Sequence, residues 1–241
     1  MGVKGDRMRW LAALMMTALL AGCVTPVAQP PQSAPLATEA AYLPPREAAR
    51  NFITAVAAME PVVERACRAR IPNNRCDFQI VVDDRRDQPP NAFQTIDKQG
   101  RPILGFTLAL IADARNVDEI AFVMGHEAAH HILGHIPQQQ QSATQGALIA
   151  GILVAAGGGG SDAIENAQKI GASLGARRFS KGFELEADAL GTELTEAAGF
   201  DALRGANFFS RIPDPGDQFL GTHPPNAARI DTVQQVVSRL R

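Results

Sequence analysis

The sequence is poor in several features that would place a protein in a class directly. No apolar run reaches the roughly 18 residues that a spanning helix needs, so no lasting transmembrane helix is expected. Neither sign of charge dominates, with 23 Lys and Arg against 25 Asp and Glu, which argues against a nucleic-acid partner. Cysteine is scarce, with three residues. Hydrophobic residues make up 46% of the chain, and this fraction excludes bulk disorder.

Residues 1–22 have the layout of a secretory signal peptide. A basic start precedes an apolar run from Trp10 to Gly22, which is too short to span a bilayer. The run ends in Leu20-Ala21-Gly22-Cys23, which resembles a bacterial lipobox, where the signal is cut before a cysteine that receives lipid. We therefore expect Cys23 to be lipidated and to tether the chain to a membrane. The alternative is an ordinary signal peptide with a chance cysteine.

The residues after Cys23 indicate a location and a linker. No Asp follows the cysteine, and in Gram-negative lipoproteins this favours the outer membrane. Residues 23–45 are expected to form the lipidated cysteine and a proline-rich linker, because six of the 16 prolines lie in 24–45. Fully stretched, the linker would reach about 70 Å at ~3.1 Å per residue. We expect a lipid-anchored protein of the bacterial cell envelope that faces the periplasm.

The two other cysteines are Cys67 and Cys76. An exported compartment is oxidising, so the two thiols are expected to form a disulfide. The alternative is two separate buried thiols, which are common in protein cores.

Residues 46–241 are expected to form one α+β domain, mostly helical with a small β-sheet. Apolar periodicity and turn residues predict strands near 78–82, 91–96 and 103–108. They predict helices over 46–70 (with a kink or a new start at Pro61), 116–136, 180–198 and 225–240. Asn116 and Glu119 form a capping box for the second helix, and Pro137 is expected to end it. Gly199 is the expected cap of the third.

The segment Gly146–Gly160 is rich in Ala, Gly, Leu, Ile and Val. It is compatible with a buried or covering helix, a mobile flap or an interfacial segment, and we favour the buried or covering helix over membrane contact. Its glycines would suit a hinge, so it is also a candidate cover for a cleft.

The chemistry is carried by an HExxH motif inside the second predicted helix, His126-Glu127-Ala128-Ala129-His130. A spacing of four places His126 and His130 on one helical face, where both imidazoles can bind one Zn²⁺. Glu127 is placed to act as the general base on a water whose pKa the metal lowers. The alternative is a pair of surface or core histidines without a metal.

A catalytic zinc site takes three protein ligands. A metzincin would place Gly three residues and His six residues after the second ligand, but Leu133 and Ile136 stand there. A glutamate on a later helix can supply the third ligand instead, and Glu184 in Glu184-Leu185-Glu186-Ala187-Asp188 is the candidate. Asp188 lies one turn further along the same face and is expected to hydrogen-bond a ligand imidazole. Glu186 points elsewhere and is expected to be solvated.

Several ordered motifs resemble the zinc metallopeptidase family that includes the CAAX prenyl protease and HtpX, in its periplasmic lipoprotein branch. The resemblance spans about residues 46–237. The motifs that carry it are Asn91-Ala92-Phe93, Asp118-Glu119-Ile120, the HExxH motif, Phe179-Ser180, Glu184 to Gly191, Ala198 to Asp201, His223-Pro224-Pro225 and Arg229-Ile230. It implies a zincin-like gluzincin fold with His126, His130 and Glu184 on one zinc per chain and Glu127 as the base.

Roles are also expected for the remaining histidines and for Arg229. His223 either caps the open zinc position or stabilises the oxyanion of the reaction, and the alternative is a loop histidine that only packs. His131 is expected to be structural, and His135 to be a charge at a helix C-terminus. Arg229 either binds a substrate carbonyl or pairs with an acidic residue, and we favour the pair.

The sequence therefore predicts a zinc endopeptidase that acts on proteins or peptides, with quality control of envelope proteins as its role. That role would bring it into contact with envelope assembly machinery. Two other functions stay open: a chaperone-like assembly factor with a mostly closed zinc site, and a zinc hydrolase of cell-wall peptides.

Overall fold

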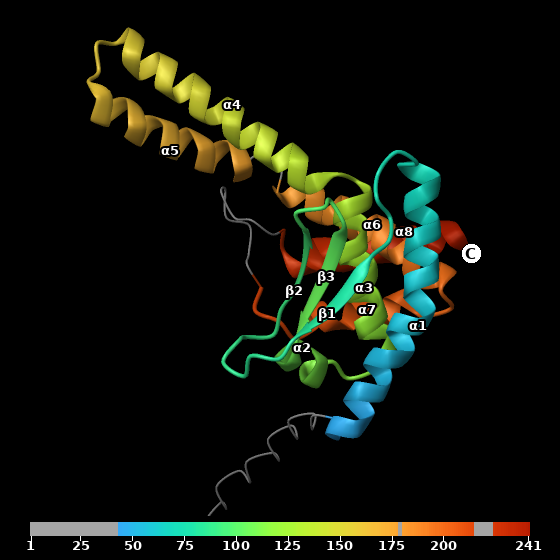
Figure 1. The fold of residues 1–241 in the computed structure, drawn as a ribbon. Coiled ribbons are helices and arrows are strands. Elements are labelled where there is room, and N and C mark those ends of the chain that lie inside the picture. Colours follow the sequence, from blue (N-terminus) through green and yellow to red (C-terminus); the bar gives the residue numbers. More distant parts are fainter. Residues whose placement is uncertain (1–42, 178–179, 215–223) are drawn as a thin grey trace, which may run out of the picture. The chain divides into compact units, whose positions relative to one another are not determined.

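A computed structural model describes residues 43–177, 180–214 and 224–241. Tyr42–Arg241 form one compact unit. Its elements run in the expected order, from a helix through a small sheet to a series of helices, so the α+β fold class is confirmed (Figure 1). The signal peptide, Cys23 and most of the proline-rich linker lie outside the described residues, as do Phe179 and His223.

The first helix, α1 (Pro45–Arg70), begins with Pro45 in its first turn, where the missing N–H has no partner to lose. Of the two expectations for Pro61, a new helix start is wrong, because one helix continues through Pro61. Ala55, Met59 and Val63 are fully buried on one face of α1, and this packing offsets the lost backbone hydrogen bond.

The three predicted strands are present close to the expected ranges, as β1 (Gln79–Asp83), β2 (Ala92–Ile96) and β3 (Pro102–Thr107). They form a sheet in the order β1-β3-β2, with β1 parallel and β2 antiparallel to β3. Leu104 and Phe106 of the central strand are fully buried. The short helix α2 (Leu108–Asp113) follows at once, with Thr107 as its N-cap.

Helix α3 (Val117–Ile132) carries the HExxH motif through the middle of the unit. The side chain of Asn116 accepts a hydrogen bond from Glu119 N, which confirms the predicted N-cap, and Arg211 pairs with the Glu119 carboxylate. The expected end at Pro137 is wrong. Gly134, in a left-handed conformation with φ 69°, ends this helix and begins the next.

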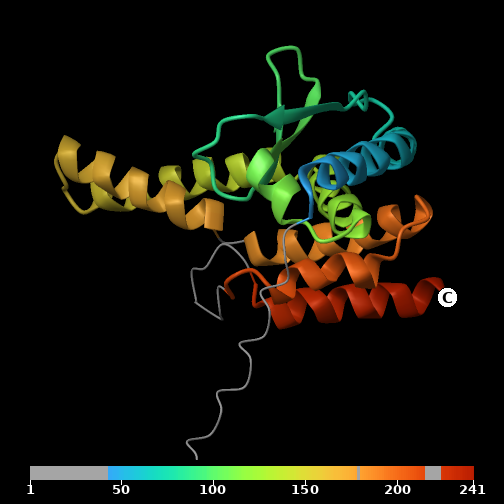
Figure 2. The same ribbon diagram turned by 90° about the horizontal axis from the view of Figure 1, so that it is seen from below.

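Helix α4 (His135–Ala156) therefore contains Pro137 in its first turn, where a proline is tolerated. It forms a hairpin with α5 (Ser161–Arg177), and the pair projects from the rest of the unit (Figures 1 and 2). The expectation that Gly146–Gly160 forms a buried or covering helix is wrong: Leu148, Ile149, Ile152 and Leu153 are 58–68% exposed. No described helix is long and apolar enough to cross a membrane.

The C-terminal part is a series of helices, of which the first two pack against α3 and the last packs on those two (Figure 2). It consists of α6 (Ser180–Ala197), α7 (Ala202–Ala206), the 3₁₀ helix η1 (Asn207–Ser210) and α8 (Asn226–Leu240). Gly199, with φ 85°, ends the α6 region as predicted. Phe122 of α3 belongs to a buried apolar cluster with Phe209, Val233 and Val237, and α8 packs against α6 and α7.

Candidate metal centre

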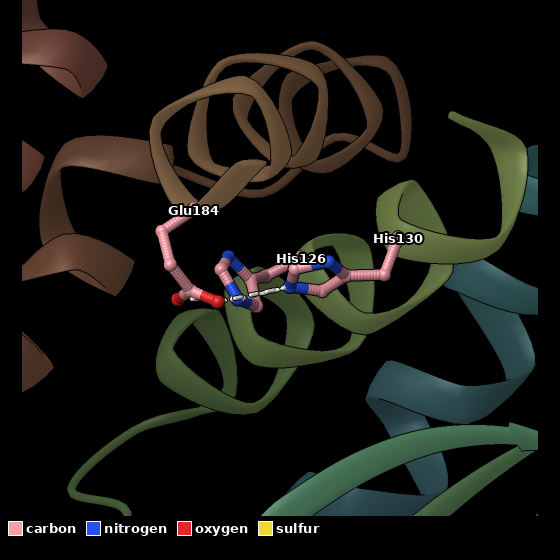
Figure 3. Close-up of side chains that lie close together, drawn as sticks. All are labelled: His126, His130 and Glu184. Atoms are coloured by element: carbon pink, nitrogen blue, oxygen red, sulfur yellow. Dashed lines mark hydrogen bonds and ion pairs between the residues drawn. The ribbon is translucent and has the colours of Figure 1, made fainter. Parts of the chain in front are cut away.

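Two histidines of α3 and one glutamate of α6 point their side chains at a common point (Figure 3). One ligand atom from each of His126, His130 and Glu184 can be chosen so that all three lie within 4.8 Å of one another. The two Nε2 atoms are 3.1 Å apart, and each lies 3.5 Å from a Glu184 carboxylate oxygen. The three residues predicted as ligands are therefore brought together.

Close contact between α3 and α6 makes this arrangement possible. Gly125 and Gly191 meet where the two helices cross. A Cβ atom on Gly125 would lie 2.8 Å from Gly191 O, and one on Gly191 would lie 2.8 Å from His126 N. Because neither glycine has a side chain, the helices approach closely enough for Glu184 to reach both imidazoles.

His126 is oriented from behind by a buried ion pair. Its Nδ1 donates to Asp188 Oδ1 at 2.9 Å, and Arg229 of α8 donates to both Asp188 oxygens at 2.7 Å. The Arg229 guanidinium also lies 3.9 Å from the centroid of the Phe209 ring. In its neutral form, which metal binding requires, His126 keeps the proton on Nδ1 and its Nε2 lone pair faces the ligand cluster. Asp188 and Arg229 thus occupy the positions that the sequence favoured for them.

His130 is oriented by a residue that sequence reasoning missed. Its Nδ1 lies 2.9 Å from His135 Nδ1, and His135 Nε2 lies 3.2 Å from Glu186 Oε2. One set of tautomers satisfies the chain: His130 donates to His135, His135 donates to Glu186, and the His130 Nε2 lone pair is left for a metal. His135 is buried and stacks on Phe183, so its expected role as a helix C-terminal charge is wrong.

No local pattern pointed to His135, because its contact with His130 depends on the chain reversal at Gly134. Glu186 is solvated as expected, since its side chain is 61% accessible. Its carboxylate nevertheless holds His135 in place.

Glu127 faces a cavity of about 1010 Å³ whose lining also includes His126, His130, Glu184 and residues 91–94 of the β2 region. Burial raises the pKa of Glu127, while the charge of His126 lowers it. The backbone of Gln94 also acts to lower this pKa. A carboxyl group with a raised pKa beside a metal site is suited to accept and return a proton.

The pKa values of the two ligand histidines diverge in the metal-free cluster. Burial acts to lower the pKa of His126, but hydrogen bonds to Asp188 and Glu184 raise it to about 10. Burial, aided by the charge of His126, lowers the pKa of His130 to about 3. Burial acts to raise the pKa of Asp188, but hydrogen bonds from Arg229 and His126 lower it. The metal-free cluster therefore holds a single positive charge on the two imidazoles, opposite the Glu184 carboxylate.

The spacing of the ligand atoms suits zinc. A tetrahedral centre with bonds of about 2.0–2.1 Å separates its ligand atoms by about 3.3–3.4 Å. The two Nε2 atoms are 3.1 Å apart, and each lies 3.5 Å from a different Glu184 oxygen, His126 from Oε2 and His130 from Oε1, so the cluster is close to the size that zinc needs. Two imidazole nitrogens and one carboxylate oxygen are also the donor set of a catalytic zinc site with one open position.

Two further predictions concern residues away from the ligand cluster. Cys67 and Cys76 are joined by a disulfide that links the end of α1 to the loop before β1. His131 lies against Phe78, and its Nε2 donates to Arg75 O, which is a structural role. The predicted roles of His223 and Cys23 are not addressed, because both residues lie outside those that the structure describes.

An HExxH helix with a third ligand on a later helix defines a metallopeptidase of the gluzincin type. The chain belongs to peptidase family M48, whose match covers residues 57–237. The family resemblance seen in the sequence is thereby confirmed.

Two relatives are similar over shorter stretches. One, from Vibrio cholerae serotype O1, is named "Putative beta-barrel assembly-enhancing protease" and is 34% identical over 113 residues, which is 44% of this chain and 23% of the relative. The other, "Beta-barrel assembly-enhancing protease" of Yersinia pestis, is 27% identical over 146 residues, which is 55% of this chain and 30% of the relative. The matched part thus spans less than a third of either relative.

Proposed function

We propose that this protein is a zinc-dependent endopeptidase, anchored by lipid in the bacterial envelope, that cleaves misfolded or misassembled envelope proteins. The observation that carries the proposal is the convergence of His126, His130 and Glu184 beside Glu127 on one wall of a cavity. Membership of peptidase family M48 supports the same reaction class.

The residues divide the work of peptide hydrolysis among them. A zinc ion held by His126, His130 and Glu184 would polarise the scissile carbonyl and make water more acidic. The Glu127 carboxylate accepts a proton from the attacking water and returns it to the leaving amine. Asp188 and His135 keep the two imidazoles in the tautomers that leave both Nε2 atoms free for the metal.

The edge strand β2 offers a place for an extended peptide. Within the described residues β2 pairs with β3 on one side only, and Ala92, Phe93 and Gln94 line the cavity that holds Glu127. A substrate segment added beside β2 would gain backbone hydrogen bonds that do not depend on its side chains. Unfolded or unassembled segments are extended and free to pair in this way, whereas folded proteins are not.

The envelope location rests on the lipobox-like Leu20–Cys23 and on the names of the two relatives, which refer to β-barrel assembly. A role near envelope assembly machinery follows from the same names. Membrane fractionation of cells that produce the Cys23→Ala variant tests the anchor. We expect the variant to leave the membrane fraction. Wild-type mature protein that is not lipidated would contradict this part.

Incubation of the purified protein with an unfolded outer-membrane protein tests the activity. We expect internal cleavage that a chelator stops and that added zinc restores. In a parallel incubation with cell-wall peptides, cleavage of those peptides and not of the protein would indicate the cell-wall hydrolase. Improved folding of the substrate without any cleavage would indicate the chaperone-like factor.

A further inference from the structure

The α4–α5 hairpin carries a large apolar surface that nothing in the described structure covers. Ile149 and Leu153 lie one turn apart on α4, and Ile170 and Leu174 lie one turn apart on α5. We call these four residues the hairpin face. They are 46–68% exposed, and Leu148 and Ile152 continue the apolar surface around α4. Soluble proteins seldom leave so many large apolar side chains together in water.

The two helices of the hairpin pack through their small residues. A Cβ atom on Gly171 would lie 2.2 Å from Gly146 O, and one on Gly175 would lie 2.1 Å from Ser142 O. Ala150 also borders Gly171. Small residues spaced four apart thus fill the contact, while the large apolar residues point outward. In water the reverse arrangement is favoured, whereas helices surrounded by lipid pack in this way.

Charge is distributed so that one side of the hairpin can enter an apolar phase. From Ile136 to Gly160 the sequence has no Asp, Glu, Lys or Arg. The charged residues of α5 near the turn, Asp162, Glu165 and Lys169, share a helical face. At 100° per residue that face lies roughly 120° away from Ile170 and Leu174. The hairpin can therefore lie on a surface with its charges in water.

The apolar length suits one leaflet. Gly146–Ala156, the apolar end of α4, would be ~16 Å long at 1.5 Å per residue, against about 30 Å for the hydrocarbon core of a bilayer. A segment of this length lies in the interface, as amphipathic membrane-surface helices do.

We propose that the hairpin face docks onto the lipid surface of a membrane, as a contact separate from the acyl chain expected at Cys23. A lipid surface, unlike a protein partner, needs no matching shape and suits the outward placement of the large apolar residues. The chain between Cys23 and α1 is long enough for both contacts at once, since a linker of its composition reaches up to about 70 Å.

The contact also bears on the metal centre. Helix α4 begins at His135, which hydrogen-bonds to the ligand His130, and it runs from there into the hairpin. A hairpin held at the surface keeps the cavity within the length of one helix, ~33 Å, of the lipid. Segments of envelope proteins that emerge at the membrane would then lie within reach of Glu127.

Vesicle binding by the chain from residue 24 onward tests the proposal without the signal peptide or the lipid. This chain retains the whole of the compact unit Tyr42–Arg241. The probe is a vesicle of phosphatidylcholine and phosphatidylglycerol, and binding is measured by co-sedimentation. We expect the wild-type chain to bind and the Ile149→Glu/Leu153→Glu variant to bind at least ~10-fold more weakly, because two apolar contacts are lost and two charges are added.

A matched control also replaces one exposed Ile and one exposed Leu with Glu, but outside the hairpin. It is Ile53→Glu/Leu240→Glu, at positions that are 66% and 51% exposed. We expect this control to bind as the wild-type chain does, with circular dichroism showing that all three chains are folded. A Leu153→Trp variant adds a direct readout, because the single Trp of the sequence is Trp10 and is absent from this chain. Its emission should shift to the blue and be quenched by brominated acyl chains.

Three results would overturn the proposal. The first is a wild-type chain that fails to bind vesicles, and the second is equal binding by the two Glu variants. The third is a dimer of the chain that only the hairpin variant abolishes. The last result would assign the face to a second copy of the chain. None of these results depends on proteolysis, so the proposal and the endopeptidase activity fail or stand separately.

Discussion

Arg229 and Asp188 form a two-pronged ion pair at the back of the metal centre, with both N–O distances at 2.7 Å. Asp188 is fully buried and Arg229 is nearly so. The pair joins the C-terminal helix α8 to α6, and through His126 it joins both to α3. The same interaction therefore stabilises the fold and sets the tautomer of His126, one of the three predicted metal ligands.

Removing one member of this pair should destabilise the fold strongly. Arg229→Met leaves the buried Asp188 carboxylate without the guanidinium that pairs with both of its oxygens, and we expect it to lower the free energy of unfolding by about 3–5 kcal/mol in urea denaturation. Arg239→Met, an exposed change on the same helix, is the control and should stay within about 0.5 kcal/mol. Adding Asp188→Asn to Arg229→Met should recover part of the loss. Strictly additive losses would show that the pair is not coupled.

Glu184 is expected to be the third metal ligand. Glu184→Ala should reduce the bound zinc, measured by atomic emission after gel filtration, from about one per chain to a small fraction, because a catalytic site with two protein ligands holds zinc weakly. Glu193→Gln, on the same helix, pairs with Arg70 at the surface and should leave the zinc content unchanged. Normal zinc in the Glu184 variant would remove this residue from the ligand set.

His135 should act on the metal through His130. We expect His135→Ala to weaken zinc binding about 10–100-fold in a competition titration with a chelating dye, because the imidazole of His130 loses the partner that orients it. His131→Ala is the matched control, since His131 is the neighbour of His130 but faces Phe78 and Arg75. His135→Gln, which can still accept from His130, should recover part of the affinity. Equal affinities for all three variants would make His135 a packing residue only.

The Cys67–Cys76 disulfide closes a short loop, with a sequence separation of 9. Chain entropy predicts that Cys67→Ser/Cys76→Ser lowers the free energy of unfolding by about 2.5 kcal/mol. Urea denaturation of the oxidised wild-type protein and the variant measures this loss, and reduced wild-type protein should resemble the variant. A thiol assay that finds two free cysteines in the exported protein would contradict the pairing.

Local sequence patterns predicted the parts of the site that depend on local geometry. Two histidines four residues apart share a face on any α-helix, so His126 and His130 could be assigned once the capping signal at Asn116 located the helix. Glu184 and Asp188 followed by the same rule. His135 could not be found in this way, because the left-handed turn at Gly134 determines where it points.

The hairpin shows a second limit of prediction from the sequence. An apolar composition predicts burial only if the large side chains face the protein, and in Gly146–Gly160 they do not. The glycines of Gly146–Gly160 looked suited to a hinge, but two of them, Gly146 and Gly151, lie against α5 in close helix packing. Composition alone does not distinguish these two uses of glycine. The spacing Gly171–Gly175, opposite Ser142 and Gly146, becomes informative only when the two helices are known to be antiparallel neighbours.

The central claim is that Glu127 moves the proton in zinc-dependent peptide hydrolysis at this site. The most direct test is a comparison of Glu127→Gln with the wild-type protein for both zinc content and the rate of cleavage of an unfolded outer-membrane protein. We predict about one zinc per chain in both proteins and a cleavage rate roughly 10²–10⁴-fold lower in the variant. Cleavage at the wild-type rate by a zinc-loaded Glu127→Gln protein would contradict the account.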